Sequence, residues 1–203
     1  MRIGVIADTH GYFDPRLREL LAGVEVILHA GDVGTQAVLD ELGQIAPVRA
    51  VRGNVDPPEL NLPLSLKLDI EGLKVEMMHI LPVPQSEVED WADRTLEIGG
   101  KPPRRSEAFL KTFDDAIGVV VFGHSHQPCL ITLGRRLFFN PGSAGKKRFD
   151  LPRCCGLLEV VPSHAAASTG GRLETLPAGI ASILPLEKHR ESLPHRVQLD
   201  FEE

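Results

Sequence analysis

Short apolar segments that end abruptly in polar, metal-capable residues are the most constraining feature of this sequence. The first three of these segments are predicted to be strands, and helical patterns lie between them. The strands are expected at 2–7, 25–29 and 48–51, and the helices at about 14–23 and 35–43. Strands that alternate with helices at this spacing predict βαβ units and therefore an α/β fold with a layered sheet.

The rest of the chain predicts a second group of strands. The strands expected there are 65–70, 73–79, 118–122, 130–133, 136–139 and 156–161. Glu71-Gly72 and Gly134-Arg135 separate two pairs of these strands and predict hairpin turns. Two further helices are expected near 87–96 and 106–113.

We interpret residues 1–203 as a single domain, because typical domains have about 100–200 residues. Residues 81–117 are irregular and contain several prolines, and we interpret them as an insertion that serves as a lid or as the interface of a homo-oligomer. Residues 162–203 form a C-terminal extension whose structure the sequence leaves open. Within it, 193–201 is either a strand or a loose tail.

Composition limits the partners and the compartment. Lys and Arg number 22 and Asp and Glu 28, so the formal net charge is −6, and we expect no binding to duplex nucleic acid. No stretch approaches the ~18 apolar residues needed to cross a bilayer, and the N-terminal apolar run is too short for a signal peptide. Three cysteines, two of them adjacent, do not suit a disulfide framework and favour a cytoplasmic location.

The polar residues at the strand ends carry the chemistry. Ligands gather at the carboxyl ends of the strands in α/β sheets, so we expect these side chains to line one cleft. The five ends read Asp8-Thr9-His10, His29-Ala30-Gly31-Asp32, Arg52-Gly53-Asn54-Val55-Asp56, His79 and Gly123-His124-Ser125-His126. Without His29 and Asp56, these ends supply two carboxylates, one amide and, depending on whether His79 is counted, three or four imidazoles.

This mixture of donors is chemically specific. Imidazole together with carboxylate suits zinc, manganese, iron, nickel or cobalt better than calcium or magnesium. The donors outnumber the four ligands of a closed zinc site and favour two metal ions about 3.5–4 Å apart that share a bridging carboxylate. Two divalent ions carry four positive charges, of which two carboxylates and one hydroxide neutralise three. The centre therefore keeps about one positive charge, which attracts an anionic phosphate ester.

The same residues resemble the signature of the calcineurin-like metallophosphoesterase superfamily. The matching motifs, in order, are Asp8-x-His10, Gly31-Asp32, Gly53-Asn54, His79 and Gly123-His124-x-His126, with His29 before the second motif and Asn140-Pro141-Gly142-Ser143 after the last. The resemblance covers roughly residues 1–161, and the size is similar to that of the small bacterial and archaeal phosphodiesterase branch. It implies an αββα sandwich, in which two mixed β-sheets pack face to face with helices outside.

The resemblance also implies how the ligands divide between two metal ions. One ion would take Asp8, His10, Asp32 and His126, and the other would take Asp32, Asn54, His79 and His124, so that Asp32 bridges. A hydroxide between the ions would attack phosphorus in line, and Asp32, Asn54 and His124 would be the catalytic residues. The implied cofactor is a pair of divalent transition metal ions, with manganese favoured over iron, nickel, cobalt and zinc.

The predicted function is therefore a metal-dependent phosphodiesterase, a hydrolase that acts on a small phosphorylated substrate. Two positions depart from the family pattern: Val55 stands where many members have a histidine that contacts phosphate, and Ile80 follows His79 where many have glycine. Val55 favours an activated diester over a monoester with a poor leaving group. Ile80 narrows the site or shifts its loop, and a purely structural role for His79 stays an alternative.

Other interpretations stay open at the level of sequence. A eukaryotic branch of the superfamily, a retromer subunit, keeps the fold as a protein–protein interaction scaffold, but here all seven ligand positions are filled, which favours catalysis. A nuclease would need a basic groove interleaved with aromatic residues, which the sequence lacks. His29 is expected to orient a ligand or contact phosphate, or else to be structural, and Asp56 is expected to brace its turn.

Overall fold

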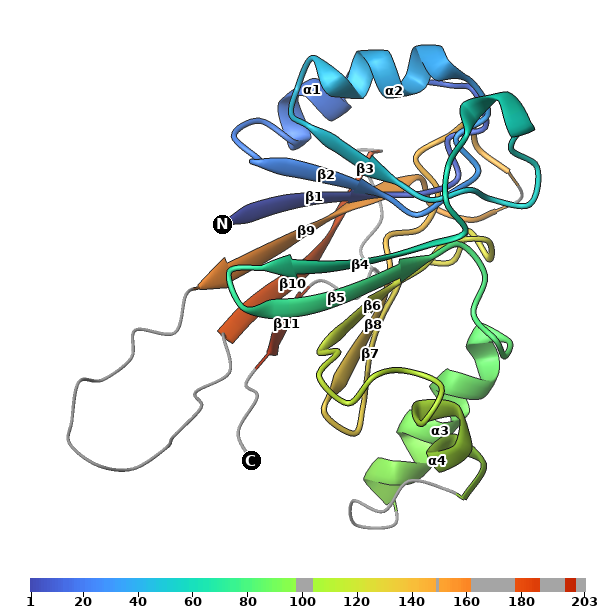
Figure 1. Cartoon of the computed structure of the whole chain (residues 1–203), viewed down its shortest axis with the longest axis vertical. Coiled ribbons are helices and arrows are strands. Elements are labelled where there is room, and N and C mark those ends of the chain that lie inside the picture. The colour runs from blue at the N-terminus through green and yellow to red at the C-terminus, as the bar shows by residue number, and fades with distance from the viewer. Residues whose placement is uncertain (98–103, 149, 162–177, 187–195, 200–203) are drawn as a thin grey trace, which may run out of the picture.

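The computed structural model describes residues 1–97, 104–148, 150–161, 178–186 and 196–199. Within these residues two β-sheets pack face to face, and helices cover the outer face of each sheet (Figure 1). Both sheets contain parallel and antiparallel neighbours. The predicted αββα sandwich of two mixed sheets is therefore confirmed.

The larger sheet contains the first three strands of the chain. Its order in the described residues is β11-β10-β9-β1-β2-β3. The strands are β1 (Arg2–Ile6), β2 (Val26–His29), β3 (Val48–Ala50), β9 (Cys154–Val161), β10 (Ala178–Pro185) and β11 (Arg196–Leu199). β1 runs parallel to β2, and β9 runs antiparallel to β1, so β9 joins the βαβ part of the sheet to the antiparallel C-terminal strands.

The smaller sheet has the order β4-β5-β6-β8-β7. Its strands are β4 (Ser65–Ile70), β5 (Leu73–Met78), β6 (Val119–Val121), β7 (Cys129–Leu133) and β8 (Arg136–Asn140). The two expected hairpins form, with Glu71, Gly72 and Gly134 in the left-handed conformation that such tight turns need. β6 lies between β5 and β8 and is buried along its whole length, which explains its unbroken run of valines.

The core between the sheets explains the apolar character of β1. Ile3 and Val5 point into this core, where Val119 and Phe139 of the smaller sheet meet them in one buried cluster. Ile6 points the other way and packs beneath the helices. Because both faces of β1 are covered, its residues are apolar at successive positions instead of alternating with polar ones.

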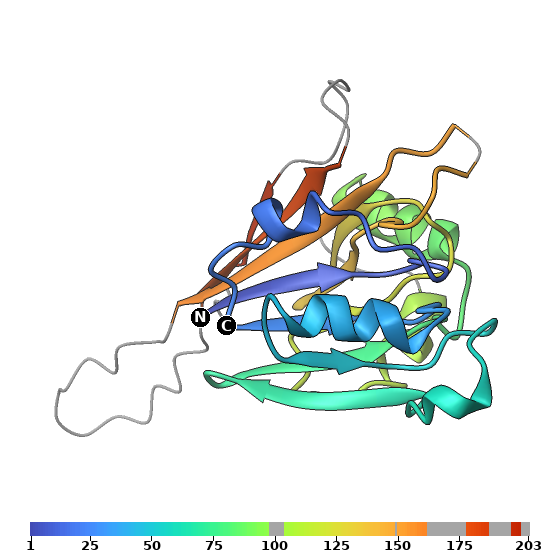
Figure 2. The ribbon, with the colours of Figure 1, turned by 90° about the horizontal axis from the view of Figure 1, so that it is seen from above.

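Helices cover the outer faces. α1 (Leu17–Leu20) and α2 (Gln36–Gly43) lie over the larger sheet (Figure 2), and η1 (Pro58–Leu60) is a short 3₁₀ turn in the loop before β4. α3 (Gln85–Glu97) and α4 (Arg104–Leu110) lie over the smaller sheet, where Trp91 and Phe109 join a buried cluster with Phe122 and Phe138. Residues 81–117 thus supply the helices of this outer layer. No helix in the described ranges combines the length and apolar character needed to span a membrane.

Two elements differ from the expectation. The first helix was expected over 14–23, but α1 covers only Leu17–Leu20, because the flanking turns bond three residues apart, as in Leu17 N–H to the Asp14 carbonyl. β10 was not predicted, since its glycine, alanines and terminal proline give little strand signal, yet it pairs with β9 over eight residues. Of the expected extension 162–203, residues 178–186 and 196–199 are described and the others lie outside the described residues.

The sandwich brings the strand ends of both sheets together. The loops that follow β1, β2 and β3 meet the loops that follow β5 and β6 at one end of the molecule (Figure 1). Backbone hydrogen bonds join these loops, including Asp8 N–H to the Gly31 carbonyl and Gly123 N–H to the His79 carbonyl, both at 3.0 Å. The predicted metal ligands are therefore carried by mutually braced loops.

Candidate metal centre

All seven predicted ligands lie at this end of the sandwich, in two adjoining clusters. In the first cluster, Nε2 of His126 lies 3.3 Å from Oδ1 of Asp8 and 3.2 Å from Nε2 of His10. One ligand atom from each of these three residues lies within 4.8 Å of the others. Two ring nitrogens and a carboxylate oxygen therefore converge on a single point.

The second cluster contains Asp32, Asn54, His79 and His124. Nε2 of His79 lies 3.3 Å from Oδ2 of Asp32 and 3.1 Å from Oδ1 of Asn54. Nδ1 of His124 lies 3.0 Å from the same Asn54 oxygen. The two histidine rings face each other edge to face with their centroids 5.4 Å apart. His79, for which a structural role was the alternative, thus contacts two other predicted ligands.

Two carboxylates connect the clusters. Oδ2 of Asp32 lies 3.3 Å from His79 in the second cluster and 3.9 Å from Nε2 of His10 in the first. Asp8 also reaches both, because ligand atoms of Asp8, Asp32 and His79 lie within 4.8 Å of one another. The sequence interpretation gave the bridging position to Asp32 alone, and the geometry adds Asp8 as a close neighbour of both clusters.

The buried environment of Asp8 fits a metal ion. The residue is fully buried, and its Oδ1 accepts no hydrogen bond from the described residues. A buried carboxylate oxygen without a donor is unfavourable unless a cation or ordered water satisfies it. Since the neighbours of this oxygen are imidazole nitrogens, the donor set suits a divalent transition metal ion.

The ligand loops have an unusual backbone. Five of the seven predicted ligands have positive φ angles between 48° and 70°. This left-handed backbone conformation is rare for residues other than glycine. They are Asp8, His10, Asp32, His124 and His126. Each such conformation costs of order 1 kcal/mol, and strain of this kind concentrates at functional sites. The loops therefore hold the side chains in place at the expense of local stability.

Glycine allows two of these loops to approach closely. A Cβ atom on Gly53 would lie 2.0 Å from Oδ1 of Asp32, and one on Gly31 would lie 2.7 Å from the ring of His79. Neither contact is possible without moving a predicted ligand. The Gly-Asn and Gly-Asp motifs thus reflect a steric requirement at the centre.

Hydrogen bonds outside the ligand shell fix the orientation of the ligands. The Val55 N–H donates to Oδ1 of Asp32 and the His124 N–H donates to Oδ2 of Asp8, each at 3.1 Å. Nδ1 of His79 lies 2.7 Å from the Ala30 carbonyl, which directs Nε2 into the site. The other coordinating atom of each residue therefore faces the cluster. These atoms are Oδ2 of Asp32, Oδ1 of Asp8 and Nε2 of His79.

Charge at the site follows from burial and from these partners. Burial opposes both charged forms, but hydrogen bonding between Asp32 and His79 lowers the pKa of Asp32 and raises the pKa of His79. Burial, and then the charge of Arg148, lowers the pKa of His10. A lower pKa favours the neutral imidazole, which is the form that binds a metal ion.

His29 lies behind the site. It is fully buried, and burial lowers its pKa to about 4, so the ring is neutral. Its Nε2 lies 2.9 Å from Oγ1 of Thr9, which also bonds the Val33 carbonyl at 3.0 Å. Since its Nε2 is taken up by Thr9, the geometry favours a role in supporting the Asp8–His10 loop, and contact with phosphate stays a prediction. Asp56 accepts bonds from the Gly34 and Gly53 N–H groups and so braces its turn, as expected.

Arg153 supports the site and was not predicted from the sequence. Arg153 donates to the Gly145 carbonyl and to Oδ2 of Asp14, each at 2.5 Å, and thereby ties the loop after β8 to the start of α1. The Gly145 N–H bonds the Asp8 carbonyl at 3.2 Å, so this loop supports the first ligand. An isolated arginine far along the chain carries no local signal of such a role.

The two departures from the family pattern are both at the surface of the site. The Val55 side chain is 56% exposed and that of Ile80 is 48% exposed, which is unusual for large apolar residues of this chain. Val55 follows the ligand Asn54, and Ile80 follows the ligand His79. The rim of the centre is therefore apolar at two positions where polar or small residues were the family expectation.

Comparisons with known proteins agree with this geometry. A family model described as the calcineurin-like phosphoesterase superfamily domain matches residues 1–162. A probable metallophosphoesterase of Methanothermobacter thermautotrophicus is 31% identical over 158 residues, 75% of this chain and 82% of the relative. A phosphodiesterase of Methanocaldococcus jannaschii is 25% identical over 176 residues, 83% of this chain and 93% of the relative.

Among solved structures, Vps29 of Entamoeba histolytica in complex with Zn²⁺ superposes with a TM-score of 0.65. The two sequences are 21% identical, and the match covers 98% of this chain and 100% of the other. At this identity the likeness supports the fold, while the family match rests on the model over residues 1–162 and the archaeal relatives. This chain belongs to the calcineurin-like phosphoesterase superfamily.

Proposed function

We propose that this chain is a phosphodiesterase that uses two divalent transition metal ions to hydrolyse a small phosphorylated substrate. The observation that carries the proposal is the pair of adjoining donor clusters joined at Asp32, whose Oδ2 lies 3.9 Å from His10 and 3.3 Å from His79. A single closed site would not need seven convergent donors. Manganese remains the favoured metal ion, as in the sequence interpretation.

When bound, the ions would supply a nucleophile from water near neutral pH and neutralise charge on the phosphoryl oxygens. The contribution of the chain is to hold and orient. Asp8, His10 and His126 form the inner, mostly buried side of the centre, whereas Asn54 and His124 are exposed. Substrate therefore approaches from the side of Asn54 and His124, which makes these two residues, with Asp32, the candidates for contact with the reacting group.

The preference for a diester rests on Val55. Its apolar side chain offers no hydrogen bond or proton to a leaving group, so an ester with a poor leaving group would lack assistance at this position. An activated diester needs less assistance. The M. jannaschii relative named as a phosphodiesterase supports the same choice.

The cysteine content of the chain supports a cytoplasmic location for this activity.

A protein-interaction scaffold is the rival proposal, since structural neighbours include Vps29. A scaffold places no requirement on donor geometry, whereas here the strain at five ligand positions and the unsatisfied Oδ1 of Asp8 both converge on the same point. These features favour a working metal centre.

A metal-by-substrate activity screen tests the proposal. Chelator-stripped protein is reloaded with manganese, nickel, cobalt, zinc or anaerobic ferrous iron and assayed with an aryl phosphodiester and with cyclic nucleotides. Turnover well above a metal-only control, lost in Asp32→Asn and kept in Asp69→Asn on the β4–β5 hairpin, supports the enzyme. Background rates with every metal ion would overturn it in favour of the scaffold.

A further inference from the structure

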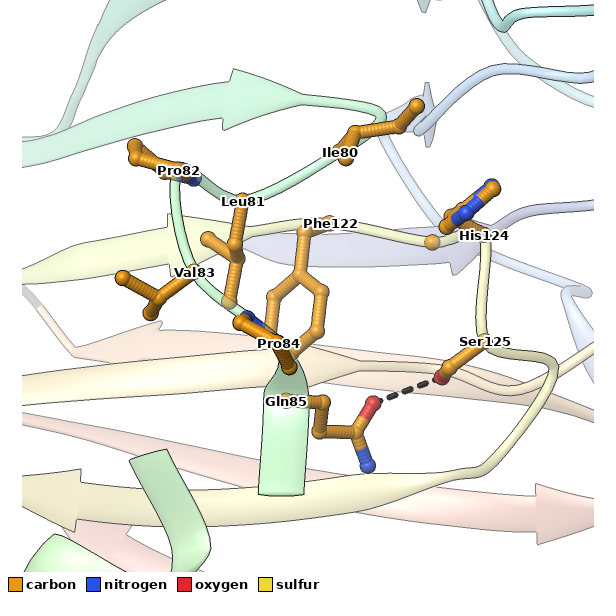
Figure 3. Close-up of a pocket in the computed structure, with 10 residues that line it drawn as sticks. Ile80, Leu81, Pro82, Val83, Pro84, Gln85, Phe122, His124 and Ser125 are labelled. Carbon is orange, nitrogen blue, oxygen red and sulfur yellow. Dashed lines mark hydrogen bonds between the residues drawn. The ribbon is translucent and has the colours of Figure 1, made fainter. Parts of the chain in front are cut away.

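An apolar pocket opens beside the candidate metal centre. Its volume is about 430 Å³, within the range of roughly 300–1,000 Å³ typical of small-molecule sites. Figure 3 shows the wall formed by the segment that follows β5 and by the aromatic ring after β6. The apolar wall residues are Ile80, Leu81, Pro82, Val83, Pro84 and Phe122.

Apart from His124, the polar side chains that line the pocket, Gln85 and Ser125, already have partners. The Ser125 hydroxyl donates to Oε1 of Gln85 at 2.6 Å (Figure 3), and the Asn140 side-chain amide donates to the same oxygen at 3.1 Å. The Gln85 amide in turn donates to Oε1 of Glu89 at 2.8 Å. Since this network is satisfied within the protein, it offers little to a polar or charged ligand. The pocket therefore selects apolar groups.

The pocket is continuous with the metal centre. His124 lines the pocket and also contacts Oδ1 of Asn54 in the second donor cluster. Ile80 and His124 lie at the same end of the pocket (Figure 3), and Ile80 directly follows the predicted ligand His79. A phosphoryl group held by the second cluster would thus have its ester substituent at the pocket entrance.

We propose that this pocket binds an uncharged aromatic ring carried by the substrate while the phosphate lies at the metal centre. The inference rests on the proposed function and narrows it to phosphodiesters with at least one aromatic ester group, such as an aryl group or a nucleobase-sized ring. The exposed rings of Pro82 and Pro84 and the partly exposed side chain of Val83 provide an apolar surface for such a group, and the buried Phe122 and Leu81 lie behind them.

The experiment compares two non-hydrolysable ligands with the same anionic head. Phenylphosphonate and methylphosphonate are titrated into the metal-loaded protein, and binding is measured by calorimetry and by NMR shifts of valine and isoleucine methyl groups. We expect phenylphosphonate to bind about tenfold or more tightly than methylphosphonate, because burial removes the ring from water. The methyl signals of Val83 and Ile80 should shift with phenylphosphonate only.

Variants then locate the ring. Val83→Asp should reduce the phenyl-to-methyl affinity ratio to below about threefold, because a buried carboxylate disfavours an apolar neighbour. Val83→Thr, which has a similar shape and a lower risk of misfolding, should reduce the ratio in the same direction. Val161→Asp is the matched control: Val161 is 52% exposed at the far end of β9 and should leave the ratio unchanged.

The outcomes separate this inference from the proposed function. Equal affinities of wild-type protein for the two phosphonates, or a ratio unaffected by both Val83 variants, would overturn the pocket assignment, while turnover of a diester would leave the proposed function standing. If neither phosphonate binds and the protein retains no metal, both proposals fail.

Discussion

Asp32 and His79 bring the two β-sheets into contact at the candidate centre, with Oδ2 of Asp32 lying 3.3 Å from Nε2 of His79. The two residues come from loops of different sheets, since Asp32 follows β2 and His79 follows β5. The centre therefore depends on the packing of the two sheets against each other.

The first prediction concerns metal content. We expect wild-type protein to bind about two transition metal equivalents per chain and to lose both metal and activity with a strong chelator. Asp32→Ala should reduce the metal content below one equivalent, because its carboxylate lies within 3.9 Å of donors in both clusters. Elemental analysis after gel filtration measures this. A full complement of metal in Asp32→Ala would contradict a bridging role.

The second prediction separates activity from stability at the exposed side of the site. Asn54→Ala and His124→Ala should each lower kcat by at least about a hundredfold, equivalent to about 2.7 kcal/mol of transition-state stabilisation. Both residues are exposed, so the free energy of unfolding of the metal-free variants should change by no more than about 1 kcal/mol. Steady-state kinetics and urea unfolding provide the two readouts. A proportional loss of both quantities would indicate a structural role.

The third prediction concerns Val55. Wild-type protein loaded with one metal ion should hydrolyse an aryl phosphodiester with a far higher kcat/KM than an alkyl phosphomonoester. Val55→His should raise kcat/KM for the monoester by about tenfold or more, because the exposed position can place an imidazole near the leaving group. Val161→His is the control for a new surface histidine. Comparable rates on the two substrates in wild type would show that Val55 does not set the preference.

The fourth prediction is a pH dependence of stability. Hydrogen bonds from Arg16, then from Arg153, outweigh burial and hold the pKa of the buried Asp14 well below its usual range. Its contribution to stability is therefore present above the ordinary Asp pKa of about 3.9 and is lost as the pH falls below it. Asp14→Asn should lower the free energy of unfolding of metal-free protein by about 3 kcal/mol at neutral pH.

The difference between wild type and Asp14→Asn should shrink when the unfolding is repeated near pH 3. Asp69→Asn serves as the comparison, because Asp69 pairs with Lys74 on the surface of a hairpin, where an ion pair contributes little. A pH-independent difference for Asp14→Asn would mean that the variant acts through packing alone.

Most residues of the candidate site could be proposed from the sequence, because each follows a recognisable local pattern. Asp8 and His124 come within three residues of the ends of apolar strands, and strand ends meet at one edge of a sheet. The supporting residues Arg153 and Gln85 could not be found in this way. Each acts through a partner more than 40 positions away, for instance Arg153 through Asp14 and Gln85 through Asn140, and their own neighbours in sequence carry no corresponding pattern.

Prediction of the fold likewise succeeded where the sequence signal is local and failed where distant contacts decide. Strands with strong β-branched patterns, such as β6, were predicted within one or two residues, whereas β10 forms mainly because β9 offers a partner edge along eight positions. The start of α1 likewise depends on turn geometry at Asp14 that propensity alone does not determine. Pairing across the sheet and capping contacts, which are tertiary effects, decide these elements.

The left-handed backbone at five of the ligand positions makes the centre difficult to transplant. A designer who copies the seven side chains onto another α/β protein would reproduce the donors without the loop path that aims them, and ordinary helical or extended loops would point them apart. A successful graft has to carry the loops from β1, β2 and β6 as intact backbone segments, together with Gly31 and Gly53, which leave room for the neighbouring ligands.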